Sequence, residues 1–137
     1  MTADEPTILA TSAGFRRGRY GLFDMSPGPI HQFAAELSGA GDTTKICFLH
    51  QAIGDPMDYI GATYAAFAKT GYRASHLQLF PMPNHDDIRA HLLAQDVIWV
   101  NGGSVANLVA VWRVHGLEEI LHEAWQAGVV LGGVSAG

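Results

Sequence analysis

The sequence is poor in basic residues and in cysteine. Its 137 residues include 8 lysines and arginines against 13 aspartates and glutamates, a formal net charge of -5. This balance offers no basic surface to a phosphate backbone or an anionic membrane, so neither nucleic acid nor a membrane is expected as a partner. The single cysteine, Cys47, cannot form an internal disulfide and stands in an apolar run, where we expect it to be buried. A reducing compartment fits these features, and they predict a cytoplasmic protein.

Long hydrophobic runs and phosphate-binding motifs are also absent from the sequence. No apolar run approaches the roughly 20 residues of a membrane span, and acidic residues precede the first apolar run, unlike a signal peptide. Neither G-x-G-x-x-G nor G-x-x-x-x-G-K-[ST] occurs, so a dinucleotide or P-loop site has no support. His85 and His91 flank two aspartates but are six residues apart, which does not align them on one helical face as metal ligands. No metal and no cofactor is therefore expected.

What is present is an alternation of short apolar runs with segments of helical periodicity. The runs predicted to be strands are residues 7–11, 45–50, 73–80, 96–100 and 129–134. Helices are expected over residues 30–39, over 56–71 with Asp55 as the capping residue, from about residue 84, and over 117–128, whereas residues 14–28 show no periodicity. This pattern is typical of βαβ units and predicts one three-layer α/β/α domain over residues 1–137, with a parallel sheet that binds ligands at the carboxyl ends of its strands.

The residues that end the last apolar run carry a catalytic motif. Residues 133–137 read G-V-S-A-G, the G-x-S-x-G pattern of a nucleophile elbow. Ser135 is therefore expected on a tight turn directly after a strand, with its hydroxyl exposed and with small neighbours because the turn is crowded. The alternative is a chance match in a chain that contains 16 glycines.

A second glycine-rich segment follows the run at 96–100. Residues 101–104 read N-G-G-S and are called the glycine loop below. Gly102 and Gly103 allow backbone N–H groups to approach a ligand closely, and the helix expected to begin at Ser104 adds partial positive charge. Together with the N–H of Ala136, these amides would stabilise the oxyanion of an acyl-transfer intermediate. The alternative is a turn that only lets the helix pack against the sheet.

Other residues near the expected strand ends are weaker candidates for contact with a substrate. Asn101 and Ser104 flank the glycine pair, and His50 ends the second apolar run at the same edge of the sheet. A capped or solvated histidine is the alternative for His50. Three arginines at positions 16, 17 and 19 follow the first strand, where they would pair with an anionic group or lie in a solvated loop.

Residues 97–137, VIWVNGGSVANLVAVWRVHGLEEILHEAWQAGVVLGGVSAG, resemble the central part of peptidase E (aspartyl dipeptidase) and its relatives, which include cyanophycinase. The resemblance extends over the whole chain and implies a flavodoxin-like fold of the class I glutamine amidotransferase type. It implies a serine peptidase of short peptides without a cofactor, with Ser135 as the nucleophile and with Ala136 and the glycine loop as the oxyanion hole. The family's loop commonly reads G-G-G-N-T, from which Asn101, Ser104 and Val105 depart.

The same resemblance places the activating histidine and its acidic partner beyond Gly137. We therefore expect the C-terminal part of the fold to be missing from this chain and its peptidase activity to be very low, because an unactivated serine hydroxyl is a poor nucleophile. An incomplete sheet is expected to make the chain marginally stable or to let it self-associate. The alternative function is a non-catalytic flavodoxin-like module that binds a small ligand or a partner chain.

Overall fold

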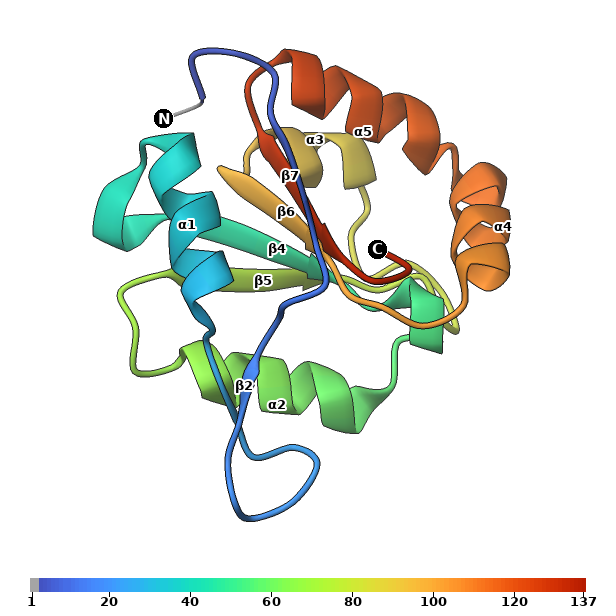
Figure 1. Ribbon diagram of the computed structural model, residues 1–137. Helices are drawn as coiled ribbons and strands as arrows, with labels where there is room; N and C mark the ends of the chain where they lie inside the picture. Colours follow the sequence, from blue (N-terminus) through green and yellow to red (C-terminus); the bar gives the residue numbers. More distant parts are fainter. Residues whose placement is uncertain (1–2) are drawn as a thin grey trace.

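A computed structural model describes residues 3–137. Five parallel strands form one sheet in the order β1-β7-β6-β4-β5 (Figure 1). The strands are β1 (Ile8–Thr11), β4 (Lys45–Leu49), β5 (Arg73–Leu77), β6 (Val97–Val100) and β7 (Val130–Val134). All five apolar runs predicted to be strands are thereby confirmed, and the parallel pairing follows from the helices that connect them.

Helices cover both faces of the sheet, as the alternation predicted. On one face lie α1 (Pro29–Ser38) and α2 (Met57–Phe67), and on the other lie α3 (Ile88–Leu93), α4 (Val105–His115) and α5 (Leu117–Gln126) (Figure 1). Two short 3-10 helices, η1 (Gly41–Thr43) and η2 (Gln51–Ile53), flank β4. The predicted three-layer α/β/α architecture is confirmed. Within residues 3–137, no helix has the length and apolar composition needed to cross a bilayer.

The core has two halves, one under each helical layer. Phe48 and Trp99 of the sheet pack in one half with Phe67 of α2, and Leu49 and Ile98 pack in the other half with residues of α3, α4 and α5. Cys47 is fully buried in the second half, as predicted. Burial raises the pKa of its thiol to about 12, so the thiol stays protonated and unreactive at neutral pH.

The predicted role of Asp55 as a helix cap is wrong. Helix α2 begins at Met57 with Pro56 as its N-cap, and the Asp55 carboxylate instead accepts the backbone N–H groups of Leu79 (2.7 Å) and Phe80 (3.1 Å). Because these N–H groups bond to a carboxylate and not to a neighbouring strand, β5 ends at Leu77 rather than at Phe80. Helix α2 also ends earlier than predicted, at Phe67.

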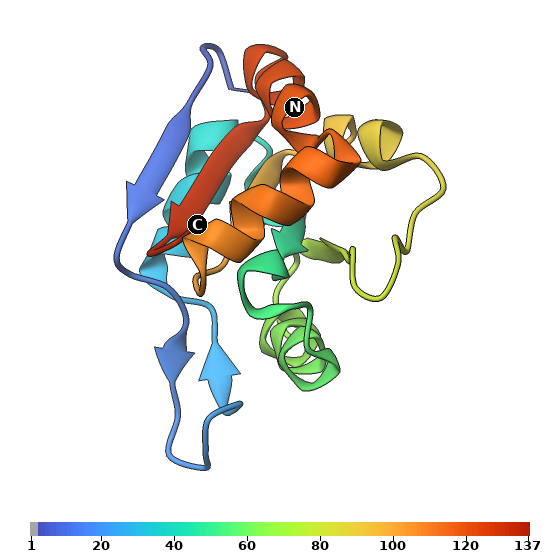
Figure 2. The ribbon, with the colours of Figure 1, turned by 90° about the vertical axis from the view of Figure 1, so that its right-hand side faces the viewer.

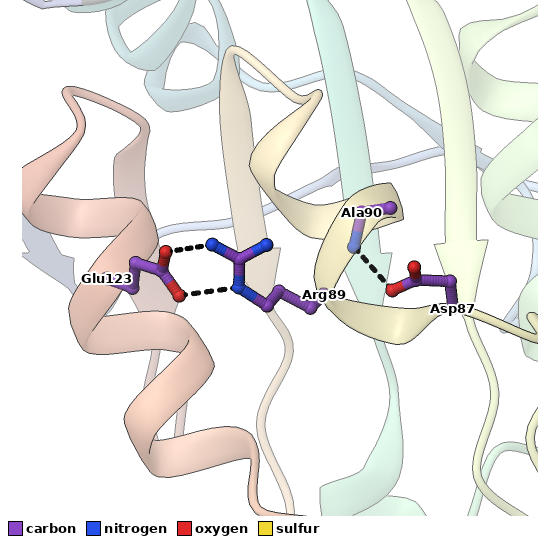
Figure 3. A network of polar contacts seen from close by, with 4 residues as sticks. All are labelled: Asp87, Arg89, Ala90 and Glu123. Carbon is purple, nitrogen blue, oxygen red and sulfur yellow. Dashed lines mark hydrogen bonds and ion pairs between the residues drawn. The ribbon is translucent and has the colours of Figure 1, made fainter.

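Helix α3 begins later than predicted, at Ile88 rather than near residue 84. The carboxylate of Asp87 caps it by accepting the N–H of Ala90 at 2.9 Å (Figure 3). Arg89 forms a two-pronged ion pair with Glu123 of α5, which links the two helices (Figure 3). Both side chains are exposed, so solvent and salt screen this pair and its contribution to stability is small.

A small hairpin occupies the region without periodicity. Its strands β2 (Arg16–Arg17) and β3 (Met25–Ser26) pair antiparallel, and the hairpin reaches away from the main sheet (Figure 2). Two-residue strands are too short to show a periodic pattern in a sequence, which is why only a loop was expected. The start of this segment brings residues 12–15 to the carboxyl edge of the sheet, beside the end of β7.

Candidate active site

The nucleophile motif lies on a tight turn at the end of β7, an interior strand of the sheet. Ser135 is exposed and has a backbone φ of 56°, in the left-handed region that non-glycine residues rarely adopt. Two hydrogen bonds fix this strained conformation: the Ser135 N–H donates to Thr11 O (3.1 Å), and the Gly137 N–H donates to Val134 O (2.9 Å). A serine held in this way at a strand-to-turn bend has the geometry of a nucleophile elbow.

Both outer glycines of the motif are required by the packing of this turn. A Cβ atom at Gly133 would overlap the carbonyl group of Gly137, and one at Gly137 would lie 2.7 Å from the carbonyl carbon of Val100. Real Cβ atoms do not approach backbone atoms so closely. The spacing of the glycines is therefore imposed by the bend that presents Ser135.

Sheet register brings the glycine loop to the elbow. Strands β6 and β7 are neighbours with Val100 opposite Gly133, so the residues that follow each strand leave the sheet side by side. A Cβ atom at Gly102 would lie 3.1 Å from Cβ and 3.6 Å from Oγ of Ser135. The two segments singled out in the sequence thus form one site, and glycine at position 102 allows their close approach.

The glycine loop is anchored at both ends and presents free amides between them. Asn101 N–H donates to a carbonyl at the end of β4 (3.0 Å), and Ser104 N–H donates to a carbonyl of η2 (2.8 Å). Among the residues that the structure describes, the N–H groups of Gly102, Gly103 and Ala136 have no hydrogen-bond acceptor. Unpaired backbone donors next to a serine hydroxyl are what an oxyanion hole requires.

These groups open into a pocket of 470 Å³ at the carboxyl edge of the sheet. Arg17, from the hairpin, is its one charged lining residue among those described, and neither a histidine nor a carboxylate lines it there. Burial raises the pKa of Tyr59, so its phenol is a neutral hydrogen-bonding group. The lining residues are Ser12, Gly14, Phe15, Arg17, Ile53, Tyr59, Asn101, Gly102, Gly103, Val134 and Ser135.

The three weaker candidates for substrate contact occupy different environments. Ser104 caps α4, because its hydroxyl oxygen accepts the N–H of Asn107 at 3.2 Å. Asn101 is almost fully buried but contributes to the pocket wall. His50 occupies the N-cap position of η2 without a side-chain capping bond, and its full burial rules out the solvated histidine of the alternative and leaves no exposed surface for a substrate. Its imidazole is hydrogen-bonded to Asn101 instead, with 3.1 Å between Nδ1 and Asn101 Nδ2.

The histidines weighed as metal ligands are close together but do not form a ligand cluster. The rings of His85, which precedes α3, and of His91, which lies within it, stack with their centroids 3.7 Å apart. Across residues 3–137, no three histidine, cysteine, aspartate or glutamate side chains gather as metal ligands would.

Replacing Gly103 by alanine is expected to lower the free energy of unfolding by roughly 3 kcal/mol. Gly103 has a φ of 145°, and an added Cβ would lie 2.6 Å from Cγ2 of Ile53 and 2.7 Å from the carbonyl carbon of Ala52. Urea denaturation measures the change. The matched control is Gly61→Ala in α2, where a Cβ meets nothing within 4 Å, and which is expected to stabilise the protein by about 0.5–1 kcal/mol. Equal urea midpoints for Gly103→Ala and wild type would contradict this loop geometry.

An exposed serine on a left-handed turn at the end of an interior strand, beside unpaired glycine amides, is the arrangement of serine hydrolases built on α/β sheets. The chain belongs to peptidase family S51, whose family model matches residues 23–137. It is 45% identical over 93 residues to a Bacillus subtilis (strain 168) protein named "Uncharacterized peptidase YgaJ". That match covers 68% of this chain and 40% of the relative.

Two solved structures share the fold. A putative peptidase E protein from Listeria monocytogenes EGD-e has a TM-score of 0.60 at 21% identity, over 80% of this chain and 53% of that one. A peptidase from an acI-B1 actinobacterium has a TM-score of 0.70 at 17% identity, over 95% and 54% of the two chains. The chain thus spans about half the length of these two structures and less than half the length of YgaJ. The peptidase E-like family and the flavodoxin-like fold predicted from the sequence are confirmed.

Proposed function

We propose that this chain carries the nucleophile and the oxyanion-binding groups of a serine peptidase that acts on short peptides. The observation that supports this function is that the exposed Ser135 lines one pocket with Gly102 and Gly103 and is followed directly by Ala136, and that the N–H groups of these three neighbours have no acceptor among the described residues. Membership of peptidase family S51 supports a peptide as the substrate. No metal or cofactor enters this reaction.

In the proposed reaction, Ser135 Oγ attacks the carbonyl carbon of a peptide bond while its proton passes to a base, which later returns it to the leaving amine. The carbonyl electrons move onto oxygen, where the three amides stabilise the developing negative charge. The C–N bond then breaks, the amine leaves with a proton, and an ester to Ser135 remains. Water attacks this ester and regenerates the serine.

Among the described residues, none that lines the pocket could act as a base and activate the serine. No histidine or carboxylate is among its described lining residues, and an unactivated serine hydroxyl reacts slowly near neutral pH. We therefore propose that this chain alone turns over peptides very slowly, and that a base supplied from outside these residues raises the rate. The relatives extend beyond the part that this chain matches, and we propose that such a base lies in the additional part.

Titration with phenylboronic acid tests the nucleophile and the oxyanion hole without requiring turnover. Boron accepts Ser135 Oγ and becomes tetrahedral and negatively charged, which resembles the oxyanion intermediate. The expected result is a saturable tetrahedral signal in ¹¹B NMR that is lost in Ser135→Ala. Ser12→Ala, at the other serine that lines the same pocket, is the matched control and should retain the signal. A signal that survives in Ser135→Ala, or is absent from the wild type, would reject the proposal.

A second candidate function, self-association with another copy of this chain, is supported by the exposed edge of the sheet. Strand β1 is an edge strand, and its Ile8 side chain is 64% exposed. An apolar groove of 420 Å³ lies between β1, β7 and α5, where Leu121 and Trp125 line it. An unpaired edge beside apolar surface invites another strand. Sedimentation velocity from about 10 to 200 μM tests this proposal, and a monomer throughout would reject self-association.

A further inference from the structure

His50 links the glycine loop to the core through a continuous chain of hydrogen bonds. Its Nδ1 lies 3.1 Å from Asn101 Nδ2, and its Nε2 lies 3.4 Å from Thr63 Oγ1. The Thr63 hydroxyl in turn donates to the carbonyl oxygen of Tyr59 at 2.9 Å. The three hydrogen-bonded side chains, those of His50, Thr63 and Asn101, are buried, so each depends on its protein partner in place of water.

The donor and the acceptor in each of these hydrogen bonds follow from the Tyr59 carbonyl, which can only accept, and from the Asn101 amide nitrogen, which can only donate. Because the Thr63 proton goes to the Tyr59 carbonyl, Thr63 Oγ1 accepts the proton carried by Nε2 of His50. Nδ1 is then unprotonated and accepts from the Asn101 amide. Burial, assisted by the neighbouring His76, lowers the pKa of His50 to about 4, which keeps the imidazole neutral at pH 7. A neutral His50 in one tautomer is therefore matched to the Asn101 donor.

Asn101 connects His50 to the candidate active site, because it is hydrogen-bonded to His50 and lines the pocket. Its backbone N–H is bonded to the end of β4 and its side chain to His50, so it is fixed at two points. The next two residues, Gly102 and Gly103, carry the unpaired amides and have little conformational stiffness of their own. The direction of their N–H groups thus depends on how firmly Asn101 is held.

We propose that His50 is a positioning residue: it holds the Asn101 amide so that the N–H groups of Gly102 and Gly103 are directed into the pocket beside Ser135, where the oxyanion would form. This inference rests on the proposed function, because it assigns those amides to the oxyanion. An apolar residue would fill the same space but would leave the buried Asn101 amide without an acceptor. Preorganisation of oxyanion donors, rather than packing alone, then accounts for a histidine at this position.

Two substitutions at His50 separate positioning from packing. His50→Leu keeps the approximate volume and removes both hydrogen bonds, whereas His50→Gln offers an oxygen acceptor to Asn101 and an N–H donor to Thr63. We expect His50→Leu to weaken phenylboronic acid binding about 10-fold, a part of the 10²- to 10³-fold effect of losing one oxyanion donor. His50→Gln should restore affinity to within about threefold of wild type. Amide hydrogen exchange at Gly102 and Gly103 should quicken in the leucine variant and recover in the glutamine variant.

A purely structural role would change the stability of the variants but not the affinity of the folded protein for the boronate. A folded His50→Leu protein that binds with wild-type affinity therefore overturns the positioning role. If that variant does not fold, Thr63→Val removes the group that fixes the tautomer. It should lower affinity a few-fold, and unchanged affinity would overturn the inference. Failure of the wild type to bind boronate contradicts the proposed function instead, which keeps the two failures distinct.

Discussion

Lowering the pH from 6.5 to 4 is expected to destabilise the folded protein by roughly 3 kcal/mol for each of two buried histidines. The pKa values of His31 and His50 are both lowered from 6.5 to about 4, first of all by burial. In this window the unfolded chain binds a proton at each histidine and the folded chain does not. The free energy of unfolding therefore falls as the pH falls, and the loss is complete below about pH 4.

The surroundings of His31 explain why it resists protonation. Its Nδ1 accepts the N–H of Gly28 at 2.9 Å, and its Nε2 has no hydrogen-bond partner among the described residues. The ring lies against Phe15 and Trp99, with centroid distances of 4.8 Å to each. Neutral His31 therefore carries its one proton on Nε2, and a second proton would have to be added to Nδ1, where it would displace the Gly28 N–H and leave a charged ring buried among aromatic side chains.

Other groups modify this pH dependence with known signs. The pKa of His91 is lowered, mainly by burial, so it adds to the loss of stability in acid. The pKa of Asp55 is raised by burial, so the folded state binds a proton there before the unfolded state does. Asp55 therefore opposes the loss, because proton uptake at this site stabilises the folded protein as the pH falls.

Urea denaturation at pH 7, 6, 5 and 4 measures the effect. His31→Gln and His50→Gln should each flatten the dependence of the unfolding free energy on pH, because an amide does not titrate in this range. His122→Gln, at an exposed position of α5, is the matched control. A wild-type protein equally stable at pH 6.5 and pH 4 would contradict the burial of two neutral histidines.

The strands of the sheet and the two glycine-containing turns of the candidate site were predictable because they depend on local sequence. Strands buried on both faces appear as consecutive apolar residues, and the tight turns after β6 and β7 need glycine, so both segments could be singled out. Their proximity could also be anticipated, because the carboxyl ends of parallel strands share one edge of the sheet. The roles of Ser135, Gly102, Gly103 and Ala136 remain predictions that the boronate titration addresses.

The rest of the site depends on contacts between distant segments, which no local pattern reveals. His50 and Asn101 are 51 residues apart, and the one available signal is that His50 ends one predicted strand and Asn101 follows another. Phe15 and Arg17 reach the pocket through a hairpin too short to have a period. Asp55 has the spacing of a helix cap, but the unpaired N–H groups of Leu79 and Phe80 compete for its carboxylate. In each case tertiary structure overrides a local preference.

Truncation of Trp99 to alanine is expected to cost about 3–5 kcal/mol of unfolding free energy, the usual range for a fully buried aromatic residue. Trp99 has no exposed surface and stands opposite Gly132 in the pairing of β6 with β7. A Cβ atom at Gly132 would lie 2.6 Å from Cζ3 of the indole, so the ring occupies the space that the glycine leaves open. The pair thereby helps to fix the register that sets the glycine loop beside Ser135.

The fit of the Trp99 ring against Gly132 predicts that substitutions at these two positions have strongly coupled effects on the free energy of unfolding. Gly132→Ala alone should be destabilising, because the new methyl group collides with the ring. In a Trp99→Leu background the same change should cost much less or become favourable, since the methyl group then fills part of the space that the indole vacates. Urea denaturation of the four proteins gives the coupling energy. Additive effects would show that the indole does not depend on the glycine, and the register of β6 on β7 would then be fixed by backbone pairing alone.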